Sequence, residues 1–157
     1  MRRKDREVVD FKRMKEIAER CDCLRLGLKD EDGVYIVPLS FGMAEEDGKL
    51  FFYFHSAPEG NKINLIREQS NVSFEMDCGH QLTAGGETAC TFGYKYQSIM
   101  GKGNVSLVAD YDEKIRGLQL LMRHYTEKND WTFKDGMVNH VAVLKLTVEE
   151  WTCKVCE

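Results

Sequence analysis

Apolar and polar residues alternate along much of the chain, and this alternation predicts a protein built mainly of β-strands. Leu24, Leu26 and Leu28 alternate with polar or small residues, as in a strand with one buried face. The acidic, glycine-containing turn at residues 30–33 then leads into residues 35–41. Turn residues between two strand-like runs favour a hairpin, so we expect these two segments to pair.

Four later segments also have strand character. Residues 50–54 are apolar throughout, which predicts a strand buried on both faces. Gly101 and Gly103 interrupt a longer run, and glycine within a strand indicates a bulge, a barrel corner or close approach to the backbone. Residues 79–93 contain several glycines and are expected to form a loop or an irregular hairpin. The remaining strands are predicted over residues 72–76, 94–107 and 141–146, the last continuing over 148–152 after a kink.

Helices are predicted at three points between these strands. The first is indicated by apolar residues near helical spacing from Val9 to Cys21. The second should follow Ser56-Ala57-Pro58-Glu59, which has the spacing of a capping box, and should run to about Arg67. Asp110 is expected to cap the third. Six strands with few helices predict a single domain over residues 1–157 that is mainly β, an antiparallel barrel with peripheral helices.

The composition argues against nucleic acids and membranes as binding partners. The chain has 157 residues, a net charge of -4 and a pI near 5.6, so it lacks the basic character that broad nucleic-acid binding needs. Its charged first residues lead into no apolar segment, and no stretch has the length of a membrane span. We therefore expect a cytoplasmic protein with no nucleic-acid or membrane partner, although a few local cations could hold a small anion.

The six cysteines raise the question of a metal or a disulfide. Only Cys153-x-x-Cys156 has the spacing of a zinc or redox pair, whereas Cys21-x-Cys23 is too tight and Cys78 has no obvious partner. We expect reduced thiols and no metal site, with the pair at residues 153 and 156 kept as a minor redox or metal alternative.

Four sequence blocks carry a family resemblance. They are Tyr35-Ile36-Val37-Pro38-Leu39-Ser40-Phe41-Gly42, Leu50-Phe51-Phe52-Tyr53-Phe54-His55-Ser56-Ala57 with Glu59-Gly60-Asn61-Lys62, Tyr96-Gln97-Ser98-Ile99-Met100-Gly101, and the helix near Asp110. In order and spacing they resemble the nitroimidazole-resistance branch of the pyridoxamine 5'-phosphate oxidase-like proteins, over residues 1–152. Two departures are Val34, where family members often carry proline, and Asn61-Lys62, where they often carry two cations.

The resemblance implies a six-stranded split β-barrel that binds flavin mononucleotide (FMN) between the subunits of a homodimer. A helix start near Ser56, together with Lys62, would hold the phosphate through backbone N–H groups and charge. The alternative is an ordinary capped surface helix with a solvated lysine. Pro38 cannot donate to a sheet ladder, so it should lie at an edge or a bulge, where free backbone groups meet the flavin ring, or it protects an edge strand from aggregation.

Further residues enter the site through the same resemblance. His55 could face the flavin or a substrate and move a proton, since imidazoles titrate near neutral pH, or it could bond locally at a strand end. Tyr96 and Ser98 share one strand face, which either faces the cofactor or lines a polar interior. The expected cofactor-binding residues are Val37, Pro38, Leu39, Ser40, Phe54, His55, Ser56, Asn61, Lys62, Tyr96, Ser98 and Trp151, with His55 as the catalytic residue.

The function implied is a flavin-dependent oxidoreductase. It would take hydride from NAD(P)H docking transiently, because the sequence has no Gly-x-Gly-x-x-Gly motif, and reduce a small electron-poor substrate such as a nitro-aromatic. The alternative is a flavin- or haem-binding sensor without turnover, in which His55 would ligate a haem iron.

Overall fold

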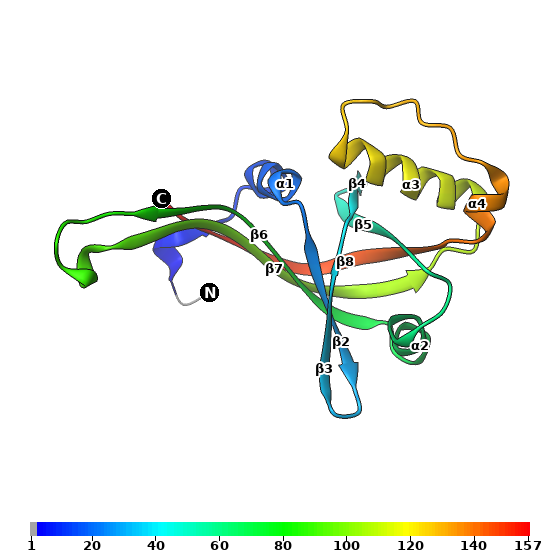
Figure 1. Ribbon diagram of the computed structural model, residues 1–157, viewed down its shortest axis with the longest axis horizontal. Helices are drawn as coiled ribbons and strands as arrows, with labels where there is room; N and C mark the ends of the chain where they lie inside the picture. Colours follow the sequence, from blue (N-terminus) through cyan, green and yellow to red (C-terminus); the bar gives the residue numbers. More distant parts are fainter. Residues whose placement is uncertain (1–2) are drawn as a thin grey trace.

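The computed structural model describes residues 3–157, which form one twisted antiparallel sheet with helices around it (Figure 1). The strand order is β3-β2-β6-β7-β8-β5-β4, and β1 pairs with β8. The strands are β1 (Glu7–Val8), β2 (Leu24–Asp30), β3 (Gly33–Leu39), β4 (Gly42–Glu46), β5 (Lys49–Ser56), β6 (Asn71–Thr83), β7 (Gly93–Leu107) and β8 (Ala142–Cys156). The helices are α1 (Phe11–Arg20), α2 (Asn61–Glu68), α3 (Tyr111–Tyr125) and α4 (Asp135–Asn139), with short 3-10 turns η1 (Lys4–Arg6) and η2 (Ala89–Thr91).

The expected fold class, a mainly β antiparallel split barrel with peripheral helices, is confirmed, but residues 3–157 contain eight strands instead of six. The additional strands are β1 and β4. β4 contains glycine, alanine and two glutamates, so its sequence lacks the alternation that marks a strand. It forms because Asp47 and Gly48 both adopt positive φ, 49° and 76°, as a tight hairpin turn into β5 requires.

β5 is buried on both faces, as its continuous apolar run predicts. Phe52 and Phe54 belong to the main core between the sheet and helices α1 and α2. Phe51 and Tyr53 point to the opposite face, into a smaller cluster with Leu118 of α3. The strand therefore joins the two cores of the protein.

The helix start predicted at Asp110 is confirmed, and the first predicted helix is present as α1, although Val9 lies before it and is exposed. Asp10 accepts a hydrogen bond from the backbone N–H of Arg13 at 2.8 Å, and Asp110 does the same for Glu113 at 2.8 Å. Met14 and Ile17 of α1 are buried in the main core, as the helical spacing predicts.

The capping-box prediction at Ser56 is wrong. Ser56 is the last residue of β5, where it is buried and pairs with Ala142, so it cannot cap a helix. The helix starts later, after Gly60 (φ 119°), and runs from Asn61 to Glu68. Sheet pairing with β8 has overridden the local capping signal.

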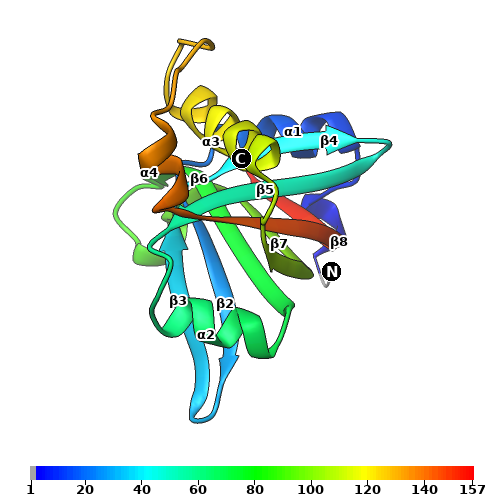
Figure 2. The ribbon, with the colours of Figure 1, turned by 90° about the vertical axis from the view of Figure 1, so that its right-hand side faces the viewer.

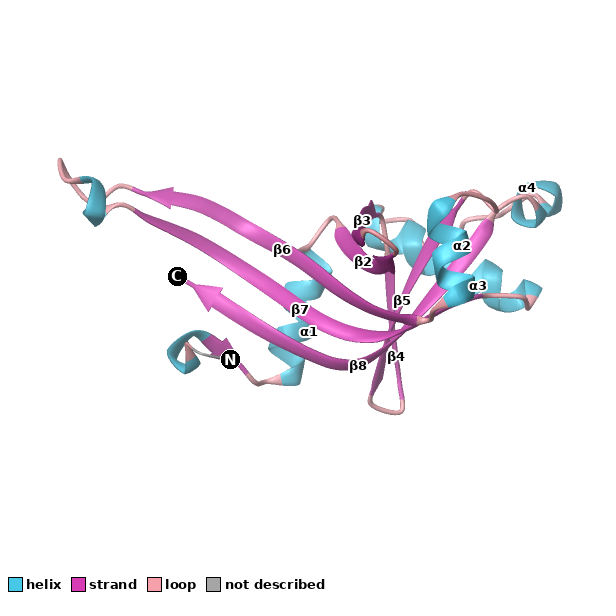
Figure 3. Ribbon diagram, turned by 90° about the horizontal axis from the view of Figure 1, so that it is seen from below, coloured by secondary structure: helices cyan, strands magenta, loops and turns pink. Residues whose placement is uncertain are grey.

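β6 and β7 extend beyond the other strands as a long arm, seen in Figure 3 to reach past the end of β8. Residues 79–93, expected as a loop or irregular hairpin, contain the ends of both strands and the η2 turn. A register shift between Cys78 and Gln81 marks the irregularity. The arm is therefore a bulged two-stranded ribbon.

Gly101 and Gly103 of β7 lie where neighbouring atoms leave no room for a side chain, as their position within a strand predicts. A Cβ at Gly103 would lie 2.1 Å from the carbonyl oxygen of Thr147. The β7–β8 register shifts at the same point, since Gly103 pairs with Val148 but Lys102 pairs with Glu150. The extra residue of this bulge is Glu149, so the irregularity lies within residues 148–152, whereas the kink was expected before them.

β8 is the strand that connects the two parts of the sheet. It pairs with β7 on one side and with β5 on the other, so it is the connection between β3-β2-β6-β7 and β5-β4.

Candidate functional site

β3 lies at one end of the strand order, so within residues 3–157 it pairs with β2 alone and its other edge stays free. Pro38 lies in this strand opposite Arg25, at the edge position that its missing N–H predicts. Pro38 and Ser40 are exposed, whereas Leu39 is buried in the main core with Val37 packed against it. The edge therefore offers unpaired backbone groups along Val37–Ser40.

The start of α2 has the features of an anion site. Gly60 carries no side chain, and within residues 3–157 no side chain caps this helix. The N–H groups of Ile63 and Asn64 bond to the Gly60 carbonyl, which leaves those of Asn61 and Lys62 as the free donors of the first turn. Free N–H groups at a helix start favour an anion.

Lys62 adds a full charge to this turn. Its side chain is partly buried, and burial lowers its pKa below the usual value because the ammonium group has lost water. No carboxylate within residues 3–157 forms an ion pair with it, and none raises its pKa. A partly desolvated cation without an acidic partner is a good binding point for an external anion.

The start of α2 lies against the β2–β3 hairpin. The side-chain amide of Asn61 donates to a carboxylate oxygen of Asp30, at the end of β2, over 3.3 Å. Figure 2 shows α2 across the β2–β3 pair, with the chain from β5 leading into it. The uncapped helix start therefore lies beside the turn end of the β2–β3 hairpin, and Val37–Ser40 lie toward the other end of β3.

The end of β5 contributes three predicted residues in different environments. Phe54 is 1% exposed, so its side chain belongs to the core and any contact with a ligand would come from its backbone. His55 is exposed and pairs through its backbone with Val143, and no hydrogen bond to its ring is present within residues 3–157. Of the three, His55 alone presents a reactive side chain to solvent.

Tyr96 and Ser98 lie on one face of β7, as the alternation predicts, but β2 and β6 separate this strand from β3. Lys154 lies opposite Ser98 and its ammonium group is 5.2 Å from the centre of the Tyr96 ring. The hydrogen bond with Lys154 is the main cause that lowers the pKa of Tyr96. Helix α2 leads into Asn71, which pairs with Asn104 near the other end of β7, so one chain does not bring Tyr96 and Ser98 to Lys62.

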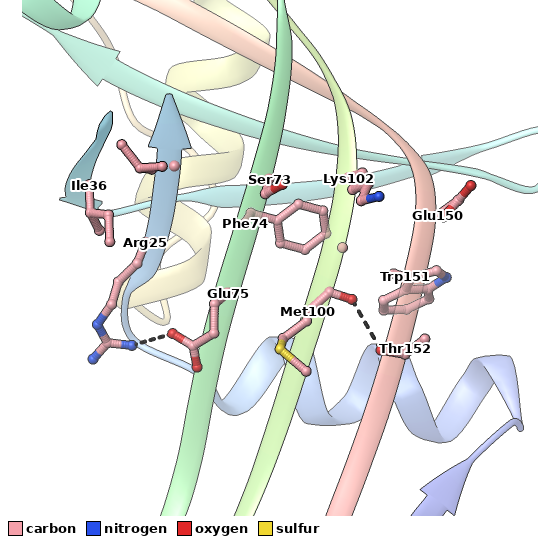
Figure 4. A pocket seen from close by; sticks show the side chains of 13 residues that line it. Arg25, Ile36, Ser73, Phe74, Glu75, Met100, Lys102, Glu150, Trp151 and Thr152 are labelled. Carbon is pink, nitrogen blue, oxygen red and sulfur yellow. Dashed lines mark hydrogen bonds and ion pairs between the residues drawn. The ribbon is translucent and has the colours of Figure 1, made fainter. Parts of the chain in front are cut away.

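A groove of about 620 Å³ runs over β3, β2, β6, β7 and β8, on the face of the sheet opposite the main core (Figure 4). Its apolar side chains are unusually exposed: Val34 is 68% exposed, Ile36 63% and Met100 54%. At one end Arg25 pairs with Glu75 at 2.9 Å and with Asp77 at 2.8 Å.

Of the predicted site residues, Trp151 alone lines this groove. Its ring also packs edge-to-face on Phe11, with ring centres 5.6 Å apart. The other lining residues were not predicted from the sequence. The available signal was the continuous run from Val34 to Leu39, which places apolar side chains on both faces of β3.

The Cys153-x-x-Cys156 alternative does not fit the structure. Both residues lie in β8, where positions three apart point to opposite faces. Cys153 is fully buried opposite Ile99, and Cys156 is partly exposed opposite Tyr96. Within residues 3–157 no group of three or more possible metal ligands is present, and no helix is long and apolar enough to cross a membrane.

Residues 13–155 match the family model described as pyridoxamine 5'-phosphate oxidase. Among solved structures, the chain is similar to a candidate 5-nitroimidazole antibiotic resistance protein from Bacteroides thetaiotaomicron. The identity is 33% and the TM-score 0.81, over 95% of this chain and 86% of that one. No curated protein sequence matches the chain.

Two more distant structures share the fold. The flavocytochrome Anf3 from Azotobacter vinelandii is 18% identical, with a TM-score of 0.79 over 100% of this chain and 72% of that one. The FAD and heme binding protein from Mycobacterium smegmatis is 13% identical, with a TM-score of 0.81 over 97% of this chain and 74% of that one.

Proposed function

Because the chain belongs to the pyridoxamine 5'-phosphate oxidase family, we propose that it binds FMN and uses it to reduce a small electron-poor substrate. The observation that carries the proposal is Lys62, a partly buried cation without a carboxylate partner at the uncapped start of α2. Similarity to a candidate nitroimidazole resistance protein supports a nitro-aromatic compound as the substrate class.

The phosphate would be held by Lys62 and by the backbone N–H groups of Asn61 and Lys62. A phosphate accepts charge-assisted hydrogen bonds from both kinds of donor, and it would replace the water that Lys62 has lost. The side chain of Asn61 is already engaged with Asp30, so its contribution would come from its backbone. The group that binds here must therefore be anionic and must reach the start of α2.

The flavin ring would lie along the free edge of β3. The unpaired backbone groups of Val37–Ser40 would hydrogen-bond the donors and acceptors on the pyrimidine edge of the flavin, and Pro38 would keep another strand from pairing there. A bound flavin would supply the hydride chemistry, while the protein supplies orientation and a proton. His55 is exposed at the end of β5, a few residues before the start of α2, and would donate that proton to the substrate.

A second copy of the chain would complete the site. Tyr96, Ser98 and Trp151 lie away from Lys62 in one chain, so they could approach the same flavin only from a partner subunit. The exposed apolar groove gives the two copies a surface to bury, and symmetric dimers are the commonest assemblies. NAD(P)H would then dock transiently at the open face of the flavin.

The test is a visible spectrum of the purified protein followed by titration with FMN. We expect a band near ~450 nm and one FMN per subunit. Lys62→Met should weaken FMN binding by roughly 10- to 100-fold, because a hydrogen bond to a charged group is worth about 1.5–3 kcal/mol. Lys49→Met removes an exposed lysine at the start of β5 and should leave affinity unchanged.

Other outcomes of the titration would change the cofactor that we assign to the protein. Preference for FAD over FMN would mean that the bound flavin also carries an adenylate group. The name of the Mycobacterium smegmatis protein, an FAD and heme binding protein, makes this outcome worth testing. A sharp band near ~400 nm with added haem, lost in His55→Ala, would favour the haem-binding alternative. A protein that binds none of these groups would contradict the proposal.

A further inference from the structure

Two cysteines that are far apart in the sequence meet beneath α1. Cys21 directly follows α1 and is 1% exposed, while Cys78 lies half-buried in β6. The sulfur atoms of both approach one carbonyl oxygen, that of Ile17: the Cys21 Sγ lies at 3.3 Å and the Cys78 Sγ at 3.9 Å. Both thiols are free in the structure.

We propose that Cys21 and Cys78 form a thiol pair that hydrogen peroxide oxidises to a disulfide. This modification site does not depend on the proposed flavin, since it uses neither the start of α2 nor the edge of β3. Oxidation would join the end of α1 to the base of the arm, at the point where the β6–β7 register shifts.

The surroundings assign different roles to the two thiols. Cys78 is the more accessible, and its Sγ lies 3.6 Å from the amide oxygen of Gln97, which in turn accepts a hydrogen bond from Arg20 at 2.7 Å. Burial raises the pKa of Cys21, and the charge and hydrogen bond of Cys78 raise it further. Peroxide should therefore react first at Cys78, with Cys21 held protonated beside it until the second step.

The reaction balances with one peroxide molecule. The Cys78 thiolate attacks a peroxide oxygen, so an S–O bond forms, the O–O bond breaks and the departing hydroxide leaves as water with the thiol proton. The Cys21 sulfur then attacks the Cys78 sulfur. The S–S bond forms, the S–O bond breaks, and a second water carries away the remaining proton. Two thiols lose two electrons in total, and the peroxide gains them.

Cys153 is the competing partner for Cys78. It is fully buried in β8, where burial is the main cause that raises its pKa to about 11, the charge of Arg13 acts against this rise and the charge of Cys78 adds to it. It lies opposite Ile99, however, whereas Cys78 lies opposite Gln97, two positions along β7. Cys21 approaches Cys78 from the helix side and shares its carbonyl contact, which favours Cys21.

The first experiment uses the full chain with the exposed Cys90 replaced, Cys90→Ser, so that the arm tip cannot react. The protein is treated with a small excess of hydrogen peroxide, blocked with an alkylating agent, digested and mapped by mass spectrometry. We expect a peptide cross-link between Cys21 and Cys78, a protein lighter by two hydrogen atoms, and reversal by dithiothreitol. Alkylatable Cys21 and Cys78 after treatment, or a link from Cys78 to Cys153, would overturn the proposal.

Matched variants then separate the two roles. Cys21→Ser should leave Cys78 as a sulfenic acid that dimedone traps, and Cys78→Ser should abolish both the cross-link and the trapping. Cys23→Ser should behave as the parent protein. Oxidation of the parent should also raise the melting temperature by roughly 5 °C or more, because the link closes a long loop. Dimedone labelling at Cys78 in the parent without subsequent cross-linking would contradict the pairing.

Discussion

The ring of Phe74 occupies the space that a side chain at Gly101 would need. These residues face each other across β6 and β7, and a Cβ at Gly101 would lie 2.4 Å from Cζ of Phe74. The carbonyl oxygen of Glu150 would lie at 2.5 Å on the other side. Glycine here is a packing requirement of the sheet that lies between the core and the groove.

Gly101→Ala should therefore destabilise the protein by roughly 1–3 kcal/mol, because the ring or the β8 backbone must move to admit a methyl group. Urea unfolding measures the change. Gly136→Ala in α4, where a Cβ would meet nothing within 4 Å, is the control and should be neutral or slightly stabilising. Equal stability of the two variants would show that Phe74 does not need the glycine.

Ile36→Asp should weaken the proposed dimer. Ile36 is 63% exposed in the groove, and a carboxylate there would have to be buried without a partner when two copies associate. Light scattering coupled to gel filtration should show a dimer for the parent and a monomer for the variant. Met137→Asp, which replaces another exposed apolar residue in α4, should remain dimeric. A dimeric Ile36→Asp protein would place the interface elsewhere.

His55→Ala should retain FMN and lose turnover. If the imidazole donates a proton to the substrate, its removal should lower the NADH-dependent reduction of a nitro-aromatic by about 100-fold, as is usual for general acids. His140→Ala provides a matched histidine, since His140 is also exposed but bonds the carbonyl of Gly136. An unchanged rate in His55→Ala would remove the catalytic role.

The free energy of unfolding should depend on pH because of Glu113. Its carboxylate accepts hydrogen bonds from Lys145 at 2.6 Å and from Tyr53 at 3.2 Å, and the bond from Lys145 is the main cause that lowers its pKa below 4.5. A lowered folded-state pKa stabilises the protein above the unfolded value, and this stability is lost as pH falls through the folded value.

Glu113→Gln should consequently cost about 1 kcal/mol at pH 7, and the cost should shrink as the pH falls below 4.5. Urea unfolding of both proteins at several pH values measures this difference. Glu87→Gln, in the exposed turn at the arm tip, should have no effect at any pH. A difference that stays constant with pH would indicate that packing, not charge, is responsible.

Much of the fold could be predicted because its strands carry their signals locally. Leu24, Leu26 and Leu28 alternate, and all three are buried in β2 as the pattern indicates. The boundary at Ser56 could not be predicted in this way. Its capping signal is local, but its pairing partner Ala142 is 86 positions later in the sequence, and the sheet pairing prevails.

In the candidate site, too, features with a local sequence signal could be predicted and features that depend on tertiary contacts could not. Pro38 indicated a free edge from its own chemistry, and the edge is present. The isolation of Lys62 from carboxylates and the meeting of Cys21 with Cys78 depend on tertiary packing, which sequence spacing does not encode. Sequence spacing instead indicated Cys153 and Cys156, which the alternation of a strand places on opposite faces.

The central position of β8 has a consequence for synthesis of the protein. The ribosome delivers the strands from β1 to β7 before Ala142–Cys156, yet β8 alone connects β7 to β5 in the order of the sheet. Until β8 has emerged, the nascent chain can form the β2–β3 and β4–β5 hairpins but cannot join them into one barrel. Closure of the barrel is therefore a late event. Until then, the edge of the apolar strand β5 that pairs with β8 stays unpaired.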